Sequence, residues 1–224
     1  MLSIIIPAYN EELRIRDVIL RCLAEFPTQE FIVVCDGKDN TENIIRDLSP
    51  SHGNLRLLSF NKRLGKGRAI IEGFKAANGD VIGFLDADES VAPTYIRGMI
   101  DALQNADGVI ASRRLKESRI LIEQPLKRRV ASKAFNLLIR CLFGLPFKDT
   151  QCGAKFFKRN AILDIINDLE TSGFEIDVEI LWRLKKKGYK IVEYPITWKH
   201  SEGSKFSLTQ SKNMLVSLFK VRFK

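Results

Sequence analysis

Two carboxylates follow an apolar run in the first half of the chain. Asp86 and Asp88 come directly after Val81–Leu85, which has the composition of a buried strand. Unpaired carboxylates at such a position are costly, so they need a cation or hydrogen bonds. Hard divalent cations take carboxylate oxygens as ligands and can bridge them to substrate phosphates. Because ligands of open α/β sheets bind beyond the carboxyl ends of the strands, the pair predicts a metal or diphosphate site.

The cation that best suits oxygen ligands of this kind is Mg²⁺ or Mn²⁺. Asp86 and Asp88 are the predicted metal ligands, and Ser90 adds a ligand directly or through water. A simpler interpretation is also open, in which Asp88 or Ser90 caps the helix that follows. The position after a strand favours the metal.

Polar residues also follow the first two predicted strands. In the segment Pro7–Glu12, Asn10 is suited to be a helix N-cap. That interpretation leaves Tyr9 unexplained, because an aromatic ring at the carboxyl end of a strand suits a nucleotide base or a sugar. Asp36 and Gly37 occupy the equivalent place after the second strand, where they form either a turn or part of the same site.

The loop 61–68, Asn-Lys-Arg-Leu-Gly-Lys-Gly-Arg, is basic and rich in glycine. It lacks the third glycine of a dinucleotide fingerprint and the Gly-Lys-Ser/Thr of a P-loop. The loop can place backbone amides and cations beside a diphosphate, or it can be an ordinary solvated loop. The sequence leaves both interpretations open.

Short apolar strands alternate with helices through residue 111, which predicts an α/β fold with a mostly parallel sheet covered on both faces. The pattern predicts strands at 2–6, 31–35, 55–60, 81–85, 109–111, 154–158 and 190–194, and helices at 15–26, 41–48, 68–77, from 93 or 94, 127–143, 161–169, 177–187 and from 207. We expect Asn40 or Thr41 to cap the helix at 41–48. No linker interrupts residues 1–224, so we expect one domain.

Charge divides this domain into two halves. Residues 1–112 carry 12 basic and 16 acidic side chains, whereas residues 113–159 carry 13 and 3, and residues 183–224 carry 11 and 2. The distribution predicts metal and nucleotide binding in the half 1–112 and an anionic partner for the half 113–224. The four cysteines form no C-x-x-C pair, which favours reduced thiols. We expect no signal peptide and no membrane-spanning segment, since no run reaches about 20 apolar residues.

Taken in order, these motifs resemble a family. Ile4–Glu12, Val33–Gly37, the loop 61–68 and Phe84–Asp88 resemble the inverting family 2 glycosyltransferases of the GT-A fold. Ser112-Arg113, Asp149–Phe157, Phe174–Glu179, Glu193–Trp198 and Gly203–Lys205 look like the dolichyl-phosphate glucosyl- and mannosyltransferases, nearer the glucosyl branch. The chain departs from the usual pair of aspartates before Gly37, because Cys35 takes the first position.

The resemblance implies a GT-A fold with a Rossmann-like central sheet, and transfer of glucose or mannose from UDP-glucose or GDP-mannose to dolichyl or polyprenyl phosphate for protein or surface glycosylation. It implies nucleotide-sugar contacts at Pro7, Tyr9, Glu11, Asp36, Lys66, Asp86 and Ala87. The implied catalytic residues are Asp88, Asp149, Arg113, Arg129 and Lys205, with Arg114, Arg128 and Lys199 as further candidates. A lipid phosphate is already an anion, so cations that overcome repulsion matter more than a general base, and Asp149 is expected to position groups or balance charge.

The acceptor also predicts a membrane surface, on its cytoplasmic face. Phe135, Leu138, Ile139, Leu142 and Phe143 form an apolar stripe beside basic residues, and the tail repeats this with Met214, Leu215, Leu218 and Phe219. Such helices can lie in a bilayer interface or pack on the sheet, and for the tail we favour the membrane. Two alternatives remain: a glycan acceptor, which needs a carboxylate base, and a non-catalytic sugar-nucleotide or nucleic-acid binding module. We expect no nucleic-acid partner, because no such module is recognisable.

Overall fold

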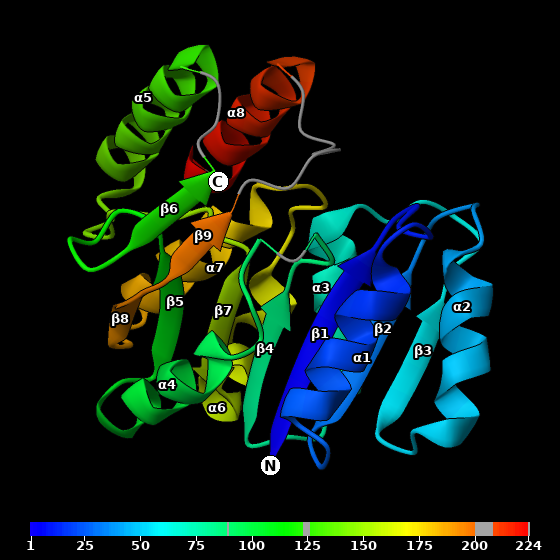
Figure 1. Ribbon diagram of the computed structural model, residues 1–224. Helices are drawn as coiled ribbons and strands as arrows, with labels where there is room; N and C mark the ends of the chain where they lie inside the picture. The colour runs from blue at the N-terminus through cyan, green and yellow to red at the C-terminus, as the bar shows by residue number, and fades with distance from the viewer. Residues whose placement is uncertain (89, 123–125, 200–207, 224) are drawn as a thin grey trace.

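The computed structural model describes residues 1–88, 90–122, 126–199 and 208–223. A seven-stranded sheet forms its centre, with the strand order β3-β2-β1-β4-β7-β5-β8 (Figure 1). The strands are β1 (Leu2–Ala8), β2 (Glu30–Cys35), β3 (Leu55–Ser59), β4 (Val81–Leu85), β5 (Gly108–Ser112), β7 (Ala154–Lys158) and β8 (Ile191–Pro195). Strands from both halves of the chain therefore share one sheet.

The sheet is mostly parallel, as the sequence predicts. Strand β7 is the exception, because it runs antiparallel to both of its neighbours, β4 and β5. It enters the sheet between two strands that come earlier in the chain, and its Lys155 pairs in register with Phe84. This insertion places the segment before β7 beside the end of β4, where Asp86 and Asp88 follow.

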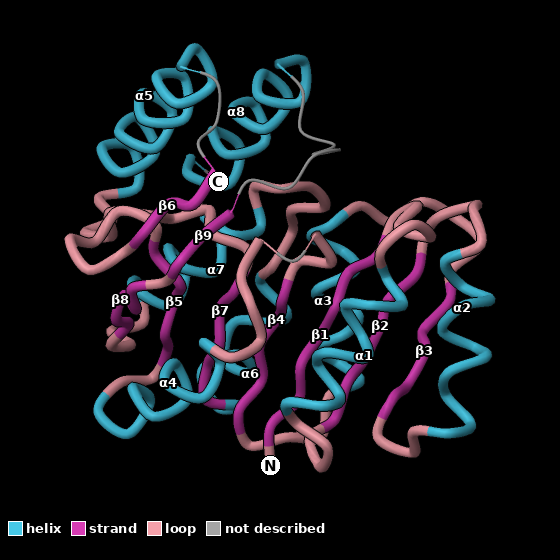
Figure 2. The backbone as a smooth tube through the Cα atoms, viewed as in Figure 1, coloured by secondary structure: helices cyan, strands magenta, loops and turns pink. Residues whose placement is uncertain are grey.

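Helices cover both faces of the sheet (Figure 2). One face packs against α1 (Ile15–Glu25), α2 (Thr41–Leu48) and α4 (Tyr95–Ala102). The other packs against α3 (Lys66–Ala76), α5 (Leu126–Phe143), α6 (Arg159–Ile165), α7 (Ile176–Lys186) and α8 (Leu208–Phe223). Alternate residues of β1 serve the two cores, with Ile5 on one side and Ile4 and Ile6 on the other.

A second sheet of two strands was not predicted. Strands β6 (Arg119–Ile122) and β9 (Thr197–Lys199) pair in parallel. Every residue of β6 is exposed. Sequence patterns identify strands through one or two buried faces, and β6 has no buried face.

The predicted helix caps hold only in part. Asn40 occupies the N-cap position of α2, as predicted, but it makes no side-chain cap bond, and the Thr41 N–H donates to Asp39 Oδ1 at 3.0 Å. Asn10 does not begin α1, whose N-cap position is Arg14. It adopts a φ of +53° and accepts the Lys38 N–H at 2.9 Å, so it ties the loop after β1 to the loop after β2.

The apolar stripe of α5 mainly packs on the sheet. Ile139 and Phe143 are buried in the core, and α8 adds Met214 and Leu218 to the same cluster. The two helices also touch directly, since Arg222 Nε donates to the Leu142 carbonyl at 3.1 Å. The interpretation that these residues lie in a membrane is therefore wrong for the buried members of both stripes, although each helix keeps apolar side chains on its outer face.

Candidate active site

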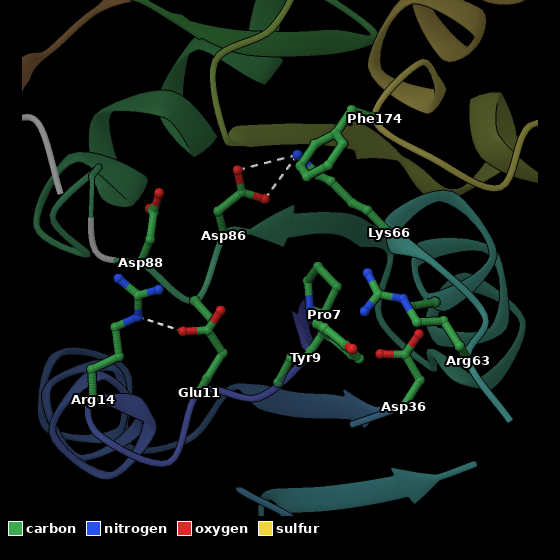
Figure 3. A pocket seen from close by; sticks show the side chains of 13 residues that line it. Pro7, Tyr9, Glu11, Arg14, Asp36, Arg63, Lys66, Asp86, Asp88 and Phe174 are labelled. Atoms are coloured by element: carbon green, nitrogen blue, oxygen red, sulfur yellow. Dashed lines mark hydrogen bonds and ion pairs between the residues drawn. The ribbon is translucent and has the colours of Figure 1, made fainter. Parts of the chain in front are cut away.

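A pocket opens at the carboxyl ends of β1, β2 and β4 (Figure 3). It is lined by Pro7, Ala8, Tyr9, Glu11, Arg14, Asp36, Arg63, Lys66, Ala69, Asp86, Ala87, Asp88 and Phe174. Parallel strands end together at one edge of a sheet, so residues that follow three separate strands converge here. The pocket brings together every residue that the sequence predicts to contact a nucleotide sugar.

Opposite charges meet at the centre of the pocket. Lys66 Nζ lies 2.9 Å from Asp86 Oδ1 and 3.1 Å from Asp86 Oδ2, and Figure 3 shows both contacts. Asp88 lines the same pocket, and its Oδ1 accepts the Ser90 N–H at 3.0 Å. Neither Asp88 nor Ser90 caps the following helix, which begins at Tyr95. The capping interpretation is therefore wrong, and both aspartates remain directed to the site.

The surroundings of Asp86 and Lys66 shift both titrations. Burial, together with the charges of Asp88 and Asp177, raises the pKa of Asp86 to about 6, while Lys66 opposes the shift. Burial by itself lowers the pKa of Lys66, but the carboxylates of Asp177 and Asp86 outweigh it and raise the pKa above its usual value. Lys66 is therefore a cation at neutral pH.

Asp36 lines the pocket and also holds the basic loop, residues 61–68. Its Oδ2 accepts the N–H groups of Leu64 and Gly65, both at 2.8 Å. The Gly67 N–H donates to the Ser172 carbonyl at 2.8 Å. These three amides are thus already engaged within the protein. The loop also brings cations to the pocket, through Arg63 and Lys66.

A loop from the second half packs against the basic loop. A Cβ atom at Gly65, where φ is +82°, would lie 2.4 Å from the Ser172 carbonyl oxygen, so only glycine fits. Buried Glu179 of α7 holds this second loop by accepting the Thr171 N–H at 2.9 Å. The contact brings Phe174 into the pocket beside Lys66.

Tyr9 follows β1, and Cys35 is the last residue of the neighbouring strand β2. The Arg63 guanidinium lies 3.1 Å from the centre of the Tyr9 ring, so a flat cation already stacks on that ring. Burial, with the charges of Glu42 and Asp36, raises the pKa of the Cys35 thiol to about 12. Cys35 is neutral at physiological pH, so it does not supply the second negative charge that an aspartate would carry at this position.

Asp149 forms a second charged group, outside the pocket lining. Its buried carboxylate accepts Arg113 Nε at 2.7 Å, a terminal nitrogen of the same guanidinium at 2.8 Å and the Arg113 N–H at 3.0 Å. Burial works to raise the pKa of Asp149, but Arg113 outweighs it and holds that pKa well below its usual range. Glu193 of β8 fixes the loop by accepting the Asp149 N–H at 3.0 Å.

The two charged groups are linked through one short segment. The Asp86 N–H donates to the Gly153 carbonyl at 2.8 Å, four residues after Asp149. A Cβ atom at position 153 would lie 2.2 Å from Asp86 Oδ2, so glycine allows this approach.

The remaining predicted cations lie at several places. Arg129 is half-buried in α5, Lys199 ends β9, and Arg114 reaches the Ser132 carbonyl and hydroxyl at 3.3 Å. None of these three lines the pocket. Lys205 lies outside the described residues, as does the side chain of Arg128.

With this geometry, the chain can be compared with known proteins. Residues 3–166 match the family described as glycosyl transferase family 2. The chain belongs to this family. The dolichyl-phosphate β-glucosyltransferase of Saccharomyces cerevisiae is 32% identical, over 92% of this chain and 69% of that protein. The undecaprenyl-phosphate mannosyltransferase of Micrococcus luteus is 29% identical over 88% of this chain and 83% of that protein.

Coverage of the relatives differs. Glycosyltransferase AglD of Haloferax volcanii is 29% identical over 93% of this chain, but the chain spans only 34% of AglD. Among solved structures, glucosyl-3-phosphoglycerate synthase from Mycobacterium tuberculosis superposes with a TM-score of 0.73 at 18% identity, over 99% of this chain and 78% of that one. This likeness establishes the GT-A fold.

Several residues of this glycosyltransferase site were not predicted. Arg14, Arg63 and Phe174 line the pocket, and Asp177 contacts Lys66. Phe174 and Asp177 belong to the motif Phe174–Glu179, in which no role was predicted for either residue, and the structure shows that Asp177 lies in a helix in which residues 176–182 are all buried.

Proposed function

We propose that this glycosyltransferase moves a hexose from a nucleotide diphosphate sugar to a polyprenyl phosphate. The observation that carries the proposal is the pocket itself, in which Tyr9, Lys66, Asp86 and Asp88 converge beyond the strand ends. An aromatic ring, a cation and two carboxylates suit the base, the diphosphate and a metal ion respectively. The yeast and Micrococcus relatives, named for dolichyl and undecaprenyl phosphate, support the lipid acceptor.

The residues fit a divalent cation, Mg²⁺ or Mn²⁺. Asp86 and Asp88 offer carboxylate oxygens, the ligand type that such ions prefer. Across the described residues no group of three or more His, Cys, Asp or Glu side chains could hold a metal. Diphosphate oxygens would therefore complete the set. When bound, the cation neutralises the charge that develops on the diphosphate leaving group.

The protein's own residues would act around that centre. Asp86 and Asp88 orient the diphosphate end of the donor, Lys66 balances its charge, and Tyr9 packs against the base. On the acceptor side, Arg113 supplies a cation whose direction Asp149 fixes. A phosphate oxygen then attacks the anomeric carbon in line, while the bond from that carbon to the diphosphate oxygen breaks and the nucleoside diphosphate leaves with the bonding electrons. The displacement inverts the configuration of the anomeric carbon.

The acceptor chemistry separates this proposal from transfer to a glycan hydroxyl. A hydroxyl acceptor needs a general base near neutral pKa. Asp149 is a poor base, because Arg113 engages both of its oxygens and holds its pKa low. A lipid phosphate needs no proton removed, so the arrangement favours it.

We also infer that the protein docks on a membrane surface to meet its lipid. None of the described helices combines the length and apolar content that a bilayer-spanning segment needs. Exposed apolar side chains nevertheless lie on neighbouring elements: Leu137 and Leu138 of α5, and Val216, Phe219 and Phe223 of α8. With Lys220 and Arg222 nearby, these suit an anionic bilayer interface. The cytoplasmic face is the side on which we expect it.

Vesicle sedimentation tests this docking. Phe219→Ser with Phe223→Ser should reduce binding to vesicles containing anionic phospholipid. The control is Leu163→Ser, an apolar residue on α6 whose exposure of 47% is close to the 44% of Phe219. Helix α6 lies at the other end of the sheet from α5 and α8 (Figure 1). Equal binding of both variants would contradict the membrane role of α8.

Organic extraction tests the activity. The protein is incubated with Mg²⁺, polyprenyl phosphate and radiolabelled UDP-glucose or GDP-mannose, and the lipid phase is counted. Label that requires both metal and lipid phosphate supports the proposal and identifies the donor. Label transferred only to a water-soluble glycan would contradict the lipid acceptor, and no transfer from either donor would contradict the proposed reaction.

A further inference from the structure

A line of alternating charges runs from the pocket into the protein interior. Lys66 Nζ, which contacts Asp86, also lies 3.0 Å from Asp177 Oδ2. The other oxygen of Asp177, Oδ1, pairs with Lys155 Nζ. Lys155 Nζ then donates to the Cys152 carbonyl at 2.7 Å. Four charged side chains therefore alternate in sign. They come from the loop after β4, from helices α3 and α7 and from strand β7.

Burial along this line increases away from the pocket. The side chain of Asp86 is 28% exposed and that of Lys66 is 10% exposed, but Asp177 falls to 2% and Lys155 to 0%. Both ammonium groups also face the ring of buried Phe84, at 5.3 and 5.4 Å from its centre. Buried charges in such surroundings are tolerated only when each has a partner. Asp177 is the shared partner of both lysines.

We propose that Asp177 is a positioning residue of the nucleotide-sugar site, which holds the Lys66 ammonium beside Asp86 so that a diphosphate meets a fixed cation. Asp86 cannot do this by itself, because a metal bound to its oxygens would repel Lys66. Asp177 lies on the side of Lys66 away from the pocket opening, so its attraction persists when the ligand binds. Lys155 balances the second oxygen of Asp177. This proposal rests on the proposed function for the identity of the ligand.

Asp177→Asn tests the proposal with almost no change in size. The amide has one acceptor oxygen, so it can serve Lys155 or Lys66 but must direct its NH₂ group at the other lysine. We expect the Kd for UDP in the presence of Mn²⁺, measured by calorimetry, to rise by about 10–100-fold, the usual effect of removing a partner that orients a ligand-binding group. The KM for the sugar donor should rise with it.

Glu30→Gln is the matched control. Glu30 is also a buried carboxylate, paired with Arg56 at 2.6 Å and with the Asn78 N–H at 2.9 Å, but it begins β2 at the opposite end of the sheet. The control should lower the melting temperature and leave the Kd for UDP within twofold of the wild-type value. An Asp177→Asn variant that also binds UDP within twofold of wild type would overturn the proposal.

A second variant covers the case in which Asp177→Asn does not fold. Asp177→Leu combined with Lys155→Met removes the carboxylate together with the ammonium that would be left without it, and leucine cannot accept a hydrogen bond from Lys66. It should fold and still bind UDP less tightly than wild type, and wild-type affinity would again overturn the proposal.

A crystal structure of the Asp177→Asn variant soaked with Mn²⁺, so that the metal rather than Lys66 neutralises Asp86, separates this inference from the proposed function. If the wild-type protein bound neither UDP nor GDP, the proposed donor would be wrong, but the position of Lys66 would still be measurable. Lys66 Nζ displaced beyond 4 Å from Asp86 in the variant supports the positioning role. Lys66 Nζ kept within hydrogen-bond distance of Asp86 overturns it, whatever the ligand.

Discussion

The buried pair Arg113–Asp149 makes the sharpest prediction about the acceptor side. Asp149→Asn keeps the size of the side chain but removes the negative charge that faces Arg113. Two of the three hydrogen bonds from Arg113 end on Oδ2 and one on Oδ1. An asparagine can accept at only one of these positions, so its NH₂ group must face a donor of Arg113 at the other.

The size of the effect follows from burial. Removing one partner of a buried ion pair costs about 3–5 kcal/mol. Since the Arg113 side chain is 20% exposed and retains some water, we expect the lower end, about 3 kcal/mol. For a domain of this length that corresponds to a fall in Tm of about 6–12 °C. Thermal unfolding at pH 7 followed by circular dichroism measures it.

The pH dependence of this loss has a definite sign. Arg113 holds the pKa of Asp149 below its unfolded value, so the pair stabilises the fold above about pH 4 and loses this contribution as the pH falls further. The difference in stability between wild type and Asp149→Asn should therefore narrow below pH 4. The same low pKa means that Asp149 adds no acidic limb to the rate profile between pH 5 and 9.

The double variant Arg113→Met with Asp149→Leu completes the test. Replacing both charges by apolar groups should recover most of the stability, because no buried charge is left without a partner. Transfer activity should stay low, since the cation for the acceptor phosphate is gone. A Tm for Asp149→Asn within 1 °C of wild type would refute the reasoning about the pair.

Three further predictions concern the donor side and the fold. Asp88→Asn should lower metal-dependent transfer by at least about 100-fold, because a bound cation supplies several kcal/mol of charge stabilisation, while its Tm stays near wild type; full activity with Mg²⁺ would contradict the metal role. Tyr9→Ala should weaken UDP binding by about 1–3 kcal/mol, the usual contribution of base stacking, and an unchanged Kd in calorimetry would place the base elsewhere. For Glu30, burial raises the pKa, but hydrogen bonds from Ser3, Asn78 and Arg56 outweigh burial and lower the pKa in the fold. Glu30→Gln should therefore destabilise the protein at pH 7, and the destabilisation should shrink as the pH falls below about 4.5. Urea unfolding at several pH values measures this dependence.

Local pattern was sufficient for most of the fold. The strand at 81–85 and the helix at 41–48 have the predicted bounds, because an apolar run and an amphipathic period mark them directly. Strand β7 was also placed correctly, but its antiparallel direction was not predicted, since direction depends on pairing with β4 and β5. The helix at 68–77 begins two residues earlier, where Gly65 with its positive φ ends the loop.

The site was predictable where it follows strand ends and not where it depends on long-range contact. Tyr9, Asp36 and Asp86 each follow a strand, so the topology of a parallel sheet brings them to one edge. The contact between Lys66 and Asp177 joins residues 111 positions apart. No local sequence pattern predicts that contact, which depends on the burial of Asp177 in α7.

The division of charge along the sequence has a different meaning in the folded protein. An acidic first half and a basic second half suggest two separate tasks, yet one central ion pair, Lys66–Asp177, crosses the boundary between them. Asp86 of the first half is held by the segment that carries Asp149, and Lys66 is held by Asp177. Lys155 donates to the Cys152 carbonyl, so the line of charges from Asp86 to Lys155 reaches the segment 149–153. Arg113 binds the same segment through the side chain of Asp149. The candidate donor-side and acceptor-side groups are thus joined through one short segment, residues 149–153.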